Sequence, residues 1–173
     1  MMKLKTSDYQ NSYLTFKLGK EEFAANVKNV LNILEYTRIT EVPKAPEYMK
    51  GVINLRGEVL PVIDTRIKFG MSPAEIDSNT CIIVTEIQMD KEEVRIGALV
   101  DSVQQVLEIE ENQIEPCPTI GNQYNSEFIS GMVVDNDKFI MILNINKVFS
   151  QEEIEDVQSS SSLNYDNTEE LSM

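Results

Sequence analysis

The sequence predicts a mainly β fold of two similar small barrels of short strands, packed on one another. Three observations lead there: short apolar runs with a two-residue period, glycine-containing turns between them, and a repeat that relates the two halves of the chain. The chain has 173 residues, enough for one domain or for two small ones that share a core.

The first predicted elements are a hairpin and a short helix. Residues 14–18 alternate apolar and polar side chains, a turn follows at 19–21, and residues 22–24 can pair back as a second strand. Apolar residues within 27–34 are spaced by three and four, which predicts a short helical face.

A longer hairpin is predicted at residues 51–63, with a tight turn at Arg56-Gly57-Glu58. Pro61 cannot donate to a strand ladder, so it favours a sheet edge or a bulge. Asp64 can then cap a short helix at 65–69.

The second half of the chain repeats this order of elements. The predicted elements are strands at 80–87 and 94–100 around an acidic turn, a helix-like stretch at 103–107, a loop at 112–127, a hairpin at 129–145 and a terminal helix at 147–157.

The repeat is visible in the apolar pattern. Residues 51–69 match 131–149 without a gap, and residues 27–33 match 103–109. Chance similarity between short β repeats is the alternative to a true duplication. Each half alone is too small to bury much apolar surface, so the two are expected to pack together.

The charge of the chain excludes several functions. It carries 15 Lys and Arg against 29 Asp and Glu, a net charge of −14, and it has no His. Without His, Ser-His or Cys-His nucleophiles and His-ligated metal sites are unavailable. The acidity argues against nucleic acid, which needs Lys and Arg to neutralise phosphates.

The last 24 residues hold seven acidic residues and no Lys or Arg, so residues 1–149 carry −7. With four consecutive serines, the segment from about Gln158 is predicted to be a disordered tail. No run approaches the length of a membrane span, so we expect a soluble intracellular protein.

No group of residues predicts catalysis or a cofactor. The acidic run at 108–115 lacks the pattern of a calcium loop and is expected to be a solvated face. Cys81 begins an apolar run, which favours a buried thiol, and Cys117 lies between two prolines with no partner ligands nearby in sequence. Arg56 is a cation within an otherwise apolar hairpin, either a binding residue or a plain turn residue in water.

Four segments carry a resemblance to a known family. LTFKLGKEEF (14–23), VPKAPEYMKGVINLRGEVLPVIDTRIKFG (42–70), IGALVDSVQQVLEI (96–109) and FISGMVVDNDKFIMILNI (128–145) resemble the CheW-like coupling proteins of bacterial chemotaxis. The resemblance covers about residues 13–150.

The resemblance implies two tandem SH3-like five-stranded β-barrels, with short helices at connections and at the C-terminus. They would form one CheW-like domain over 13–150, made of intertwined subdomains at about 13–75 and 76–150 whose terminal segments can exchange. Outside the resemblance, the composition predicts an acidic tail over 151–173, a short helix and then disorder.

The resemblance also implies a function without catalysis, metal or cofactor. Such proteins join transmembrane chemoreceptors to the histidine kinase CheA, binding the kinase's regulatory domain and the cytoplasmic tip of the receptors. We therefore expect a cytoplasmic protein, monomeric alone, that works within a large signalling array and does not enter the membrane. An adaptor of a related chemosensory or twitching-motility pathway is the alternative. A nucleic-acid-binding barrel is the alternative from another class, and the charge disfavours it.

The resemblance carries over a set of site residues. The expected receptor groove comprises Val30, Asn32, Arg56, Cys81, Ile82 and Val106, and Ile120 is expected to contact a kinase domain. Ordinary core positions are the alternative for Val30, Ile82 and Val106, and for Ile120 the alternative is a residue that pins its own loop. The chain departs from the family at Asn32, where a Glu is usual. Asn32 can accept a hydrogen bond from Arg56 without a charge, and Glu35 can replace the missing Glu in part.

Overall fold

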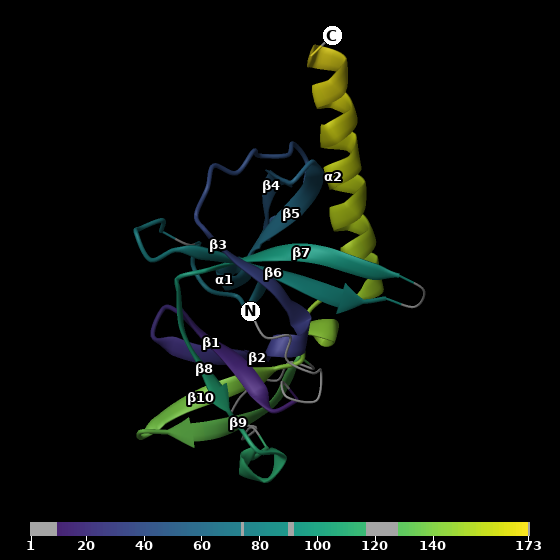
Figure 1. The fold of residues 1–173 in the computed structure, drawn as a ribbon. Helices are drawn as coiled ribbons and strands as arrows, with labels where there is room; N and C mark the ends of the chain where they lie inside the picture. Colours follow the sequence, from purple (N-terminus) through teal and green to yellow (C-terminus); the bar gives the residue numbers. More distant parts are fainter. Residues whose placement is uncertain (1–9, 74, 90–91, 117–127, 173) are drawn as a thin grey trace.

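Two five-stranded sheets form the molecule, which the computed structural model describes at residues 10–73, 75–89, 92–116 and 128–172, with only the backbone for 162–172. In Figure 1 one sheet lies above the other, and helix α2 stands beside the upper one. The elements are β1 (Ser12–Leu18), β2 (Glu21–Asn26), η2 (Val27–Asn29), β3 (Val30–Glu35), β4 (Met49–Leu55), β5 (Glu58–Asp64), α1 (Thr65–Lys68), β6 (Cys81–Gln88), β7 (Glu93–Val100), β8 (Ser102–Glu108), η3 (Glu111–Gln113), β9 (Ile129–Asp135), β10 (Lys138–Leu143), η4 (Ile145–Lys147) and α2 (Gln151–Ser172).

The predicted repeat is present in the strand order. The upper sheet runs β3-β6-β7-β5-β4, and the lower sheet runs β8-β1-β2-β10-β9. When β1–β5 are matched with β6–β10, the two orders are identical. Each sheet takes two strands from one half of the chain and three from the other, so the halves are interlocked. The predicted division near residue 75 thus marks the repeat and does not separate the two sheets.

Both sheets curl back towards their free edges. Thr40, beyond β3, bridges Val52 of β4, and Glu115, beyond β8, bridges Met132 of β9. These single bridges lie where a barrel would close, but the pairings of the described residues do not complete a ring. The predicted pair of five-stranded units is therefore confirmed as two curled sheets.

Equivalent glycines make these bridges possible. A Cβ at Gly51 would lie 2.1 Å from the Thr40 carbonyl oxygen, and one at Gly131 would lie 2.8 Å from that of Glu115. Neither contact is sterically allowed for a side chain. The glycines, 80 residues apart, admit the returning chain at the same place in each sheet.

The two hairpin turns are also equivalent. Arg56 and Gly57 have φ of 53° and 85°, and Asn136 and Asp137 have φ of 50° and 65°. Positive φ at both central residues is the geometry of a type I′ turn, which matches the twist of the flanking strands.

A continuous apolar core joins the sheets. Phe16 and Phe23 of the lower sheet pack with Ile83 and Val100 of the upper sheet in one buried cluster. The helical segments that follow β5 and β10 cross to the opposite sheet. Their aromatic side chains show it: Phe69 stacks on Phe128 at 4.7 Å between centroids and lies 5.4 Å from Phe23, and Phe149 lies 5.7 Å from Tyr48.

Two predicted helices are strands, which corrects the prediction for 27–34 and 103–107. Only Val27–Asn29 are helical, as one 3-10 turn, and Val30–Glu35 pair with β6. The second stretch is β8, paired with β1. Helical spacing over so few residues is weak evidence, and pairing with a sheet edge satisfies the backbone groups of both segments.

The C-terminal helix is shifted and longer than predicted. It begins at Gln151 and continues to Ser172, whereas we expected a helix at 147–157 followed by disorder. Ile154, Val157 and Ser161 are buried against the upper sheet, and the Ser161 hydroxyl donates to the Val157 carbonyl at 2.9 Å.

Pro61 lies in β5, between β4 and β7. The pairing with β7 begins only at Val62, so the missing N–H of Pro61 faces no ladder. No helix in the described part of the chain has both the length and the hydropathy needed to cross a membrane.

Candidate functional site

One surface hollow lies where the two sheets meet. We call it the junction hollow, of about 480 Å³, lined by Glu35, Tyr36, Asp77, Ser78, Asn79, Thr80, Cys81, Ser102 and Val103. Residues 35–36 and 77–81 belong to the upper sheet and its connections, whereas Ser102 and Val103 begin β8 of the lower sheet. The width of the hollow therefore depends on how the two sheets sit on each other.

The upper wall of the junction hollow is held by its own hydrogen bonds. Asp77 Oδ1 accepts from the Asn79 amide at 2.7 Å, and the Asp77 amide donates to the Thr80 hydroxyl oxygen at 2.9 Å. Cys81 has a free thiol, which donates to the Asn79 carbonyl at 3.3 Å. These contacts give the wall a defined shape without a partner.

A second hollow lies at the hairpin turn of the upper sheet. We call it the turn hollow, of about 300 Å³, lined by Leu31, Asn32, Leu55, Arg56, Glu58, Val84 and Arg95. Arg56 is exposed and forms no hydrogen bond or ion pair with the described residues. Arg95 has an exposed ion pair with Glu58 at 3.3 Å. The turn hollow thus offers a free cation beside apolar side chains.

Asn32 does not accept a hydrogen bond from Arg56. Asn32 Oδ1 accepts instead from the amide of Ile33, at 2.9 Å. The two residues line the same hollow, but Arg56 is left available to another molecule.

The structure divides the predicted groove residues among different places. Cys81 lines the junction hollow, whereas Asn32 and Arg56 line the turn hollow. Val30 is half-buried on the core cluster between the sheets, and Val106 is 60% exposed on β8.

Two further predicted site residues do not contribute to a described surface. Ile82 is fully buried within the upper sheet, where it packs with Leu60 and Leu99, so the core alternative holds for it. Ile120, the predicted kinase contact, lies outside the described residues.

Sequence reasoning missed several lining residues. Tyr36 and Val103 line the junction hollow, and Leu31 and Leu55 line the turn hollow. The missed signal was the alternation along β3. As a strand, residues 30–35 place Leu31 and Ile33 on the outward face, where they are 44% and 43% exposed. A helix over this segment would not place these two side chains on one outward face, so helical spacing does not predict them as surface residues.

Two carboxylates on β6 and β7, Glu86 and Glu93, influence one another's pKa. A hydrogen bond with Glu93 raises the pKa of Glu86, and burial and the Glu93 charge add to the shift. The same bond and one from Gln88 lower the pKa of Glu93. Among the residues that the structure describes, no group of three or more carboxylate, thiol or imidazole side chains could hold a metal ion.

Known proteins share both the sequence and the fold of this chain. The CheW-like domain profile matches residues 12–153. The chain is 36% identical to the chemotaxis protein CheW of Rhizobium meliloti and 34% identical to the probable chemotaxis protein CheW of Rhizobium etli, over 82% of this chain and 89% of each relative. The crystal structure of the scaffolding protein TtCheW from Thermoanaerobacter tengcongensis matches with a TM-score of 0.73 and 31% identity, over 83% of this chain and 90% of that one. The interlocked sheets and these similarities together show that the chain belongs to the CheW-like family of chemotaxis scaffold proteins.

Proposed function

We propose that this chain is a non-catalytic scaffold that couples transmembrane chemoreceptors to the histidine kinase CheA, in the cytoplasm. Family membership supports this function, since relatives are named chemotaxis proteins and one is described as a scaffolding protein. The observation that carries it is the junction hollow, whose walls come from both sheets. Such a hollow can receive a helical receptor tip and hold it against both sheets.

Exposed apolar side chains extend this surface. Ile33 on β3 is 43% exposed, and Val106 on β8 is 60% exposed. Both residues lie on strands that also contribute to the junction hollow, and exposed apolar side chains are typical of a surface that a partner covers. The receptor tip would then contact both edge strands, with Arg56 at the turn hollow offering a charged contact. Ile120 stays a predicted contact for the kinase.

Binding measurements with two probes test this function. The first probe is the CheA regulatory domain and the second is a soluble fragment of the receptor tip, both from the same organism. We expect Val106→Glu to weaken receptor-fragment binding by about tenfold or more, because a carboxylate would be placed in an apolar contact.

Val134→Glu is the matched control, since Val134 is 57% exposed on β9, at the edge of the lower sheet opposite to β8. It should leave receptor-fragment binding unchanged. Absence of wild-type binding to both probes at high micromolar concentration would contradict the proposed function.

A further inference from the structure

Asp101 lies at the point where the chain passes from the upper sheet to the lower one, between β7 and β8. We infer that Asp101 is a positioning residue: it locks the two sheets together and so sets the shape of the junction hollow. Because that hollow is where we propose the receptor binds, this role of Asp101 rests on the proposed function.

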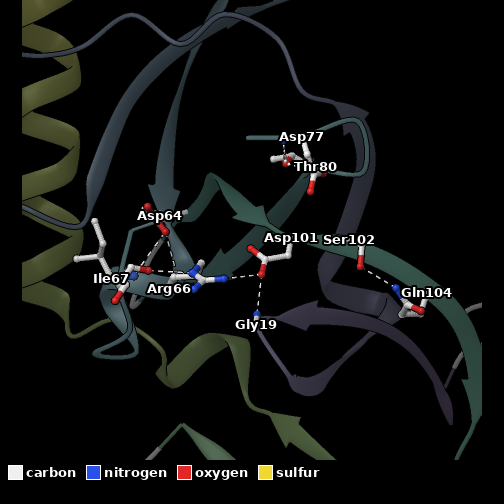
Figure 2. A network of polar contacts seen from close by, with 10 residues as sticks. Gly19, Asp64, Arg66, Ile67, Asp77, Thr80, Asp101, Ser102 and Gln104 are labelled. Atoms are coloured by element: carbon white, nitrogen blue, oxygen red, sulfur yellow. Dashed lines mark hydrogen bonds and ion pairs between the residues drawn. The ribbon is translucent and has the colours of Figure 1, made fainter. Parts of the chain in front are cut away.

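Asp101 bonds to two elements that belong to different sheets, and Figure 2 shows its contacts with Gly19 and Arg66. Its Oδ2 accepts from the Gly19 amide at 2.6 Å and from Arg66 Nη1 at 2.6 Å. Its own amide donates to the Lys17 carbonyl at 3.0 Å. Gly19 and Lys17 belong to the β1–β2 hairpin of the lower sheet, whereas Arg66 belongs to α1, which follows β5 of the upper sheet.

The direction of the Arg66 side chain is fixed. Its Nε donates to the Ser72 carbonyl at 2.8 Å, and Asp64 caps α1 by accepting from the Arg66 amide at 3.0 Å. The Arg66 and Asp101 side chains are 20% and 25% exposed, so water screens their attraction only partly. The guanidinium thus reaches Asp101 from a rigid support.

Asp101 is adjacent to one wall of the junction hollow. Ser102 and Val103, the next two residues, line it from the lower sheet, and Tyr36 and Cys81 line it from the upper sheet. A rotation between the sheets would move these walls relative to each other. The contacts of Asp101 therefore lie where a small movement between the sheets changes the shape of the junction hollow.

Apolar packing between the sheets is not directional. The core between the sheets contains an apolar cavity of about 40 Å³, with Phe16 and Ala25 on the lower side and Ile83 and Ala98 on the upper side. Dispersion contacts are not directional, so a directed polar joint adds a constraint that this core does not supply.

Two further observations distinguish Asp101 from an ordinary structural residue. Its Oδ1 is buried without a hydrogen-bond partner among the described groups, which costs folding free energy. The equivalent of Arg66 in the other repeat is Asn146, whose Oδ1 accepts directly from the Gln88 amide at 2.9 Å. That second joint is neutral and involves no carboxylate. Of these two equivalent joints, the one beside the hollow is charged and carries a stability cost, which indicates a role in function.

The test measures the distance between the sheets. Nitroxide labels at Arg95→Cys on β7 and Lys138→Cys on β10, both exposed, would report it by double electron–electron resonance. Cys81→Ser and Cys117→Ser provide the background. We expect Asp101→Ala to broaden the distance distribution or shift it by about 2 Å or more, and to weaken receptor-fragment binding by about tenfold in the unlabelled chain.

Glu153→Ala is the matched control. Glu153 pairs with Lys68 of α1 at 2.5 Å, with side-chain exposures of 31% and 16%, but it joins α1 to α2 rather than one sheet to the other. It should leave the distance distribution and the binding unchanged, even where it lowers the melting temperature as much as Asp101→Ala does.

Several outcomes would overturn the role of Asp101. An unchanged distance distribution in folded Asp101→Ala, or equal broadening in Glu153→Ala, would do so. If Asp101→Ala fails to fold, Arg66→Gln, which keeps the Gly19–Asp101 bond, takes its place and the same two results decide. If wild type binds neither the receptor fragment nor the CheA regulatory domain, the proposed function fails, while the distance measurement still decides whether Asp101 holds the sheets together.

Discussion

The upper and lower sheets have the same strand order, but they are covered differently. Helix α2 packs on the outer face of β4 and β5, where Val59 is half-buried against Ile154 and Val157. The equivalent of Val59 in the lower sheet is Phe139, which is 60% exposed beside its cross-strand neighbour Val134. The repeat thus gives both sheets the same interior. The sheets differ in whether a helix covers the outer face and in the polar contacts that connect them.

The shared features mark what the fold requires. The glycines that admit the returning chain, the type I′ turns and the polar residues that follow each hairpin recur 80 residues apart. Asp64 caps α1 and Asn144 caps η4, accepting from the amides two residues on. Other features occur in only one of the two repeats, such as α2, Arg56 and the hydrogen bonds of Asp101. We expect these unrepeated features to serve function.

The largest expected loss of stability comes from a substitution at one of the glycines that both repeats share. Gly51→Ala would place a Cβ 2.1 Å from the Thr40 backbone, and φ at this residue is +153°. We expect the free energy of unfolding to fall by about 3 kcal/mol or more, because a backbone atom cannot move aside cheaply. Gly131→Ala should cost less, since its shortest contact, 2.5 Å, is with the side chain of Ile114. Urea unfolding of both variants measures the difference, and a larger loss for Gly131→Ala would contradict the ranking.

The second effect tests the difference in coverage. Ile154 of α2 is fully buried, so Ile154→Ala should cost about 2–4 kcal/mol through lost burial and a cavity. Phe139→Ala, on the uncovered face, should change stability by less than about 0.5 kcal/mol. Thermal and urea unfolding measure both. If Phe139→Ala destabilises as much as Ile154→Ala, the lower face is not free in solution.

The third effect concerns the ion pair that holds α2 to α1. Burial acts to raise the pKa of Glu153, but hydrogen bonds from Lys68 and Ser150 outweigh it, so the pKa lies below its ordinary 4.5. A lowered pKa in the folded state means that the charged form contributes stability above pH 4.5, and that this contribution is lost as the pH falls through the folded pKa.

Glu153→Gln should therefore lower the free energy of unfolding at pH 7 by up to about 1 kcal/mol. The difference from wild type should shrink as the pH falls below 4.5, and it is measured by urea unfolding at several pH values. Lys68 keeps its contact with the rings of Tyr48 and Phe149, each 5.3 Å away, which limits the loss. A difference that grows in acid would contradict the assigned role of Glu153.

The sequence predicted the hairpins well because their signals are local. Alternation in β1, the glycine turn at residue 57 and the cap at Asp64 each depend on a few neighbouring residues. The spacing of apolar residues in β3 and β8 predicts helices, because the strands form through pairing with β6 and β1, which local spacing does not encode. The start of α2 had a local signal that was missed: the Ser150 hydroxyl accepts from the Glu153 amide, and Glu153 Oε1 accepts from the Ser150 amide.

The candidate site was harder to predict than the fold. Its residues come together only when the halves interlock, so the resemblance to a family located Cys81 and Arg56 but not the separate hollows that they line. The resemblance assigned both Cys81 and Ile82 to the groove, yet adjacent strand residues face opposite sides, and Ile82 faces the core. Asp101 showed no sequence signal beyond its place in GALVDSV, since its three partners are distant along the chain or in other elements.

The smallest expected effect on stability concerns the turn that differs between the repeats. Arg56 has a φ of 53°, a conformation that Asn adopts more readily, and Asn136 occupies the equivalent turn. Arg56→Asn should leave the free energy of unfolding unchanged or raise it by up to about 0.5 kcal/mol. It should nevertheless weaken binding of the receptor fragment, because the only change is the loss of a free cation at the turn hollow. Isothermal titration and urea unfolding measure the two quantities.

The reciprocal change in the other repeat is the control. Asn136→Arg puts the same strained residue at a φ of 50° in the lower sheet, so it should cost stability by about the amount that Arg56→Asn gains. It should not affect receptor binding, because that turn lines neither hollow. If Arg56→Asn binds as tightly as wild type, Arg56 is an ordinary turn residue. If Arg56→Asn weakens binding, a contact between the Arg56 side chain and the receptor explains why arginine occupies a turn position that asparagine fits better.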